Sequence, residues 1–141
     1  VDDVYQSGCP FQWGKGTVLR DGCDAAVIAT GLMVQEALKA ADILANRGCQ
    51  VMVIDMAAIK PLDEDLVVAA ARKTGFVVTA EEHSVIGGLG GAVAETLSRR
   101  CPTRQAYVGI QDCFGESGKA GDLLKEYGLT AEAIVDACLL A

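Results

Sequence analysis

The chain has few aromatic residues and a single histidine. Phe, Trp and Tyr make up 5% of its 141 residues, and His83 carries the only imidazole. A zinc site built on histidine therefore has little to draw on. The six cysteines lie far apart without a C-x-x-C pair, so no thiolate metal motif is present either. We interpret these cysteines as free thiols and predict a reducing, cytoplasmic compartment.

Long hydrophobic runs and basic stripes are also missing. No apolar run approaches the roughly 20 residues that span a bilayer, so we do not expect a membrane protein. Twelve Lys and Arg are scattered among nineteen Asp and Glu, which gives a net charge of −7. Nucleic-acid binding depends largely on clustered positive charge, so nucleic acid is excluded as a partner. The acidity is explained by solubility alone.

The first residues contain neither a secretory signal nor a basic transit segment, and there is no initiator methionine. We therefore expect a processed product or a piece of something longer. Residues 1–15 show no periodicity and are predicted to be a lead-in or linker. The remaining residues, 16–141, are predicted to form one domain, because 51% of the chain is apolar and its length allows a sizeable core.

Apolar periodicity alternates between strand and helix patterns along residues 16–141. Asp21-Gly22, between the first two apolar runs, predicts a tight hairpin. The later strands alternate with helices, which predicts an α/β fold with a mainly parallel sheet and helices on both faces. The expected strands are at about 16–20, 25–30, 49–56, 76–80 and 104–110, and the expected helices at about 32–47, 63–73, 88–99, within 118–128, and from 130 onward.

The stretch "TAEEHSVIGGLGGAVAETL", Thr79–Leu97, places four glycines where a strand runs into a helix. A dinucleotide-binding G-x-G-x-x-G would need a third glycine at Val93 and a place at the first strand–helix turn. Both conditions fail. The glycines are better explained by a sharp turn and by tight packing of the helix on the sheet. The motif "GESGKAG", 115–121, also fails as a phosphate loop at two positions.

Glu81, Glu82 and His83 lie at the carboxyl end of a predicted parallel strand, where open α/β sheets bind ligands. A histidine beside carboxylates can transfer protons. The same residues can instead cap a loop, contact a neighbouring subunit or remain solvated. We favour the interface or structural interpretation and keep a catalytic role for Glu82 and His83 as a weaker alternative.

Three motifs together resemble the C-terminal domain of transketolases: "IKPLD" at Ile59–Asp63, "EEHSVIGGLG" at Glu81–Gly90, and "SGKAGDLLKEYGL" at Ser117–Leu129. The resemblance extends from about Phe11 to the C-terminus. Related domains occur in deoxyxylulose-phosphate synthases and in the β subunits of 2-oxo-acid dehydrogenases. The "KPLD" and "LLKEYGL" motifs favour transketolase over both.

The resemblance implies a three-layer α/β/α domain with a five-stranded sheet, one strand of it antiparallel, in agreement with the hairpin expected at Asp21-Gly22. It implies a parent transferase of the pentose phosphate pathway that moves two-carbon ketol units between sugar phosphates. That enzyme uses thiamine diphosphate and Mg²⁺, held by N-terminal and middle domains that form the active site at a dimer interface.

This chain contains no G-D-G metal-binding stretch of the thiamine family. We therefore predict that it alone binds no cofactor or metal, has no catalytic residue and is inactive, and that it organises domains or a homodimer. Small residues on one helix (Gly90, Gly91, Ala92, Ala94) suggest close approach across that interface. The candidate interface or entrance residues are Glu82, His83, Gly87 and Gly88. The alternative is a stand-alone regulatory module that binds a nucleotide or anion near Gly31 and Gly87–Gly88.

Overall fold

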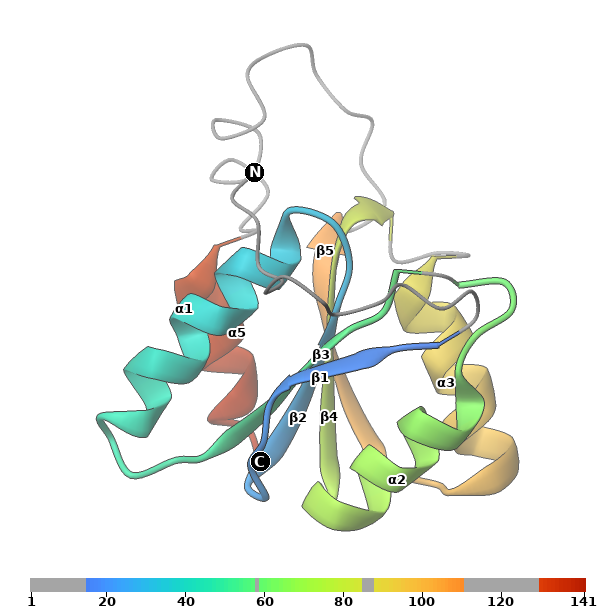
Figure 1. The fold of residues 1–141 in the computed structure, drawn as a ribbon, viewed down its shortest axis with the longest axis horizontal. Coiled ribbons are helices and arrows are strands. Elements are labelled where there is room, and N and C mark those ends of the chain that lie inside the picture. Colours follow the sequence, from blue (N-terminus) through green and yellow to red (C-terminus); the bar gives the residue numbers. More distant parts are fainter. Residues whose placement is uncertain (1–14, 58, 85–87, 111–129) are drawn as a thin grey trace, which may run out of the picture.

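The computed structural model describes residues 15–57, 59–84, 88–110 and 130–141, which build a five-stranded sheet covered by helices on both faces (Figure 1). The order across the sheet is β1-β3-β2-β4-β5. Four strands run parallel and β1 runs antiparallel to β3, so the expected fold class is confirmed. The strands are β1 Thr17–Arg20, β2 Ala25–Ala29, β3 Val51–Asp55, β4 Phe76–Ser84 and β5 Arg104–Ile110.

Among the described residues, two helices cover each face of the sheet. Helices α1 (Met33–Ala45) and α5 (Ala131–Cys138) lie on one face, and α2 (Glu64–Thr74) and α3 (Leu89–Arg100) lie on the other (Figure 1). The sheet separates two apolar cores, because successive strand residues point to opposite faces. Val27 packs in the α1/α5 core and its neighbour Ile28 in the α2/α3 core.

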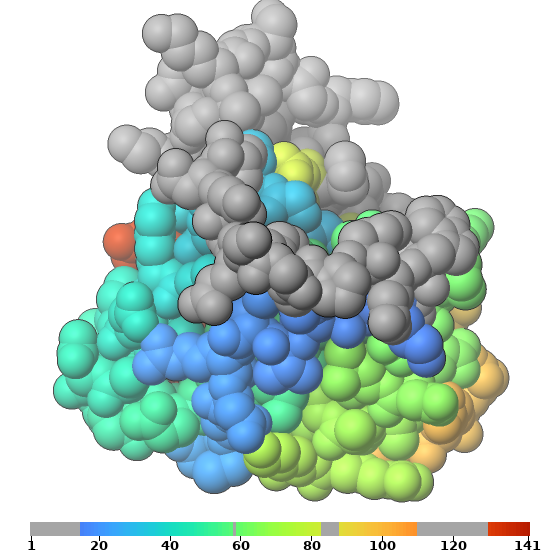
Figure 2. All heavy atoms as spheres, viewed as in Figure 1, coloured from blue at the N-terminus to red at the C-terminus, as the bar shows by residue number. Residues whose placement is uncertain are grey.

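The expected hairpin between β1 and β2 is wrong. β1 pairs with β3, and β2 lies on the far side of β3 between two parallel neighbours. All five residues of β2 are buried, so β2 takes a central position and only an outer edge remains for β1. The turn between them crosses the start of β3, where the Asp24 carboxylate accepts a hydrogen bond from the Gln50 amide at 2.7 Å. Figure 2 shows β1 at the surface between α1 and α2.

Helix boundaries follow the start and stop residues of the sequence. Asp63 caps α2 by accepting a hydrogen bond from the Leu66 amide at 3.2 Å, and Gly75 ends it with a φ of 76°. The Thr130 hydroxyl accepts from the Ala133 amide and caps α5 as expected. The helix expected within 118–128 and the boundary at residue 15 depend on segments outside the described residues. No helix among the described residues has the length and apolar character needed to cross a membrane.

Candidate functional site

Glu81 lies near the end of β4 and caps the helix that follows. Its side chain is only 1% exposed. The two carboxylate oxygens accept hydrogen bonds from the amides of Leu89 at 2.8 Å and Gly90 at 2.7 Å. The first amides of a helix have no partner within it and carry partial positive charge, so a carboxylate stabilises them. Glu81 therefore caps the N-terminus of α3.

Glu82 makes the corresponding contact in the opposite layer. Its Oε1 accepts a hydrogen bond from the amide of Leu32, just before α1, at 3.0 Å. Gly31 beside it has a φ of 57°, and a Cβ built there would lie 2.0 Å from the same Oε1. Glycine at position 31 therefore allows both the left-handed backbone and the close approach of the carboxylate.

The two glutamates face opposite sides of the sheet because they are neighbours on one strand. Each places a negative charge at backbone amides of a helix start, which could otherwise bind an anionic ligand. The regulatory alternative requires a nucleotide or anion near Gly31 and Gly87–Gly88, and carboxylates Glu82 and Glu81 already lie there. The arrangement ties β4 to α1 and α3 and is suited to a structural role.

The other candidates are only partly described. The backbone of His83 belongs to β4, but its side chain lies outside the described residues, as does all of Gly87. Gly88 is the N-cap of α3, and its carbonyl accepts a hydrogen bond from the Ala92 amide at 3.1 Å. A role of Glu82, His83, Gly87 and Gly88 at an interface or entrance stays a prediction.

Gly90 packs inside the domain. A Cβ at this position would lie 2.5 Å from the ring of Tyr107 on β5. This confirms that a glycine lets α3 pack tightly on the sheet. The suggestion that Gly90 contributes to close approach between subunits is wrong, because its open side faces the domain's own strand. Gln105 reinforces the contact by donating from Nε2 to the Gly90 carbonyl at 3.0 Å and to Thr79 Oγ1 at 3.1 Å.

A third carboxylate, Asp55, ends strand β3, which is separated from β4 by β2. It is 8% exposed, and burial raises the pKa of its carboxyl group above the usual range. Among the residues that the structure describes, no group of three or more His, Cys, Asp or Glu side chains could hold a metal ion. The capped helix ends likewise do not fit a diphosphate, since Glu81 and Glu82 would repel it. We therefore derive no chemical step through a cofactor here.

Sequence reasoning missed the partners of both glutamates. The amide that binds Glu82 is fifty positions away along the chain, and those that bind Glu81 are eight and nine away. None of these spacings is a known capping pattern. The Gln105 bridge was missed for the same reason. The indication of close packing that the sequence offered was the run of glycines between β4 and α3.

Comparison with known proteins identifies the family to which the chain belongs. A family model described as "Transketolase, C-terminal domain" matches residues 14–134. The chain belongs to this family. It is 50% identical over 127 residues to the 6-deoxy-6-sulfo-D-fructose transketolase subunit of Clostridium sp. (strain MSTE9), covering 90% of the chain and 39% of that protein. It is 48% identical over 122 residues to a 1-deoxy-D-xylulose-5-phosphate synthase of Syntrophotalea carbinolica, covering 86% of the chain and 19% of the synthase.

A solved structure matches this transketolase domain over its whole length. The structure titled "Split gene transketolase, inactive beta4 tetramer" superposes with a TM-score of 0.95 at 50% identity. The superposition includes 100% of this chain and 46% of the chain in the split transketolase structure. The chain thus spans about two fifths to one half of the transketolase subunits it matches. The remaining parts of those proteins have no counterpart in this sequence.

The described cysteines of this transketolase domain are free and differ in exposure: Cys23 is exposed and Cys138 is buried. Burial, and secondarily the nearby Cys49, raise the pKa of the Cys138 thiol to about 12. Because only the thiolate is nucleophilic, we expect iodoacetamide at about pH 8 to label Cys23 readily and Cys138 only in denaturant. Peptide mass spectrometry checks this, and equal labelling of both thiols in the native protein would contradict the burial of Cys138.

Proposed function

We propose that this domain organises the subunits of a transketolase and contains no catalytic centre of its own. The parent enzyme would transfer two-carbon ketol units between sugar phosphates in the pentose phosphate pathway of the cytoplasm. Thiamine diphosphate and Mg²⁺ would be held by N-terminal and middle domains, on the same polypeptide or on a separate subunit. The similarity to transketolase subunits supports this proposal.

One observation carries the proposal. At the carboxyl edge of the sheet, the two helix ends best placed to bind a phosphate are already filled by Glu81 and Glu82. Carboxylates at these two described helix ends would repel a phosphate, which supports a role in holding other domains in position. The related split transketolase structure is a tetramer of its beta chain, which further supports contact between copies. We extend self-association to this domain.

Reconstitution tests the proposed function. The purified domain is assayed for ketol transfer alone and after mixing with the remaining transketolase domains of its source. We expect no turnover by the domain alone and a gain of activity in the mixture, because the catalytic groups lie in the added part. His83→Ala is assayed in the domain alone, where we expect no turnover with or without the substitution. Turnover by the domain alone that His83→Ala abolishes would overturn the proposal.

A further inference from the structure

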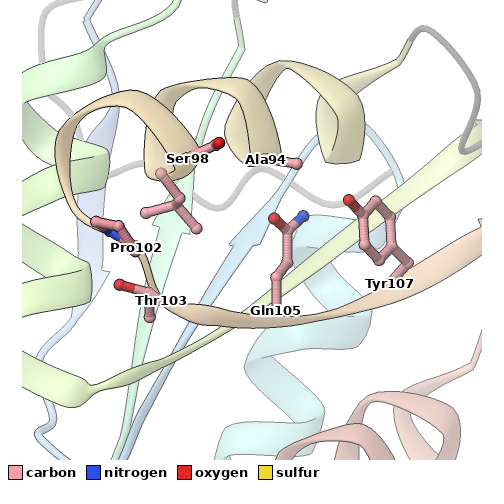
Figure 3. Close-up of a pocket in the computed structure, with 7 residues that line it drawn as sticks. Ala94, Ser98, Pro102, Thr103, Gln105 and Tyr107 are labelled. Atoms are coloured by element: carbon pink, nitrogen blue, oxygen red, sulfur yellow. The ribbon is translucent and has the colours of Figure 1, made fainter.

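We draw no further inference here: the strongest candidate, the groove of about 310 Å³ between β5 and α3 beside the partly exposed ring of Tyr107 (Figure 3), carries nothing, because the Gln105 Oε1 that lacks a hydrogen bond there is buried out of reach and nothing in the described part of the structure shows what covers the exposed apolar side chains along this edge.

Discussion

The substitution Glu81→Gln is expected to lower the free energy of unfolding by about 3–4 kcal/mol. The carboxylate accepts two short hydrogen bonds at the N-terminus of α3 from a position that is 1% exposed. Glutamine offers one acceptor, and its amide group would face a backbone N–H that also donates. One buried helix amide then loses its partner, and the interaction of the negative charge with the helix dipole disappears.

Urea unfolding of Glu81→Gln against Glu95→Gln isolates this effect. Glu95 lies on the exposed face of the same helix, so its substitution should change the free energy of unfolding by no more than about 0.5 kcal/mol. The comparison holds the amino-acid change and the helix constant and varies only burial and hydrogen bonding. If the two variants were equally stable, the capping role assigned to Glu81 would be wrong.

The second large effect is expected at Gly31, where Gly31→Ala should cost about 2–4 kcal/mol. Alanine at a φ of 57° is strained by roughly 1–2 kcal/mol. The added Cβ would also lie 2.0 Å from the Glu82 carboxylate, which must move and lose its bond to the Leu32 amide. That lost hydrogen bond accounts for the remaining destabilisation, about 1–2 kcal/mol.

Gly48→Ala is the matched control for Gly31→Ala. Gly48 also has a positive φ, 82°, but a Cβ there would meet no atom within 4 Å. Its cost should therefore be the backbone strain alone, about 1–2 kcal/mol. In the Glu82→Ala background the additional cost of Gly31→Ala should shrink toward that of Gly48→Ala. Equal costs for the two alanine variants in the unmodified chain would show that Glu82 does not restrict Gly31.

Local features of the fold were predictable from the sequence because local interactions determine them. Asp63 and Gly75 delimit α2 through bonds within a few residues, and β5 was expected at the residues where it occurs. The partner of β1 was not predictable from the Asp21-Gly22 turn. Which strand it joins depends on the burial of β2 between β3 and β4, a property of the whole sheet.

The candidate site shows the same limit. The sequence brought Glu81 and Glu82 to the carboxyl end of a strand and suggested a structural use for them. It did not indicate that they accept hydrogen bonds from the starts of two different helices. The amide bound by Glu82 precedes it by fifty residues, whereas the amides bound by Glu81 follow it. Gly90 was correctly expected to allow tight packing, yet its contact with Tyr107 depends on the pairing of β4 with β5.

Calorimetric titration of the purified domain with thiamine diphosphate and Mg²⁺ tests the central claim most directly. The account predicts no heat beyond dilution, since Glu81 and Glu82 occupy the helix ends at the edge of the sheet where a diphosphate would bind. Saturable binding with a Kd on the order of 10 μM would contradict it. The cofactor site would then lie in this chain, with the glycine turn after Glu82 and His83 as the first place to look.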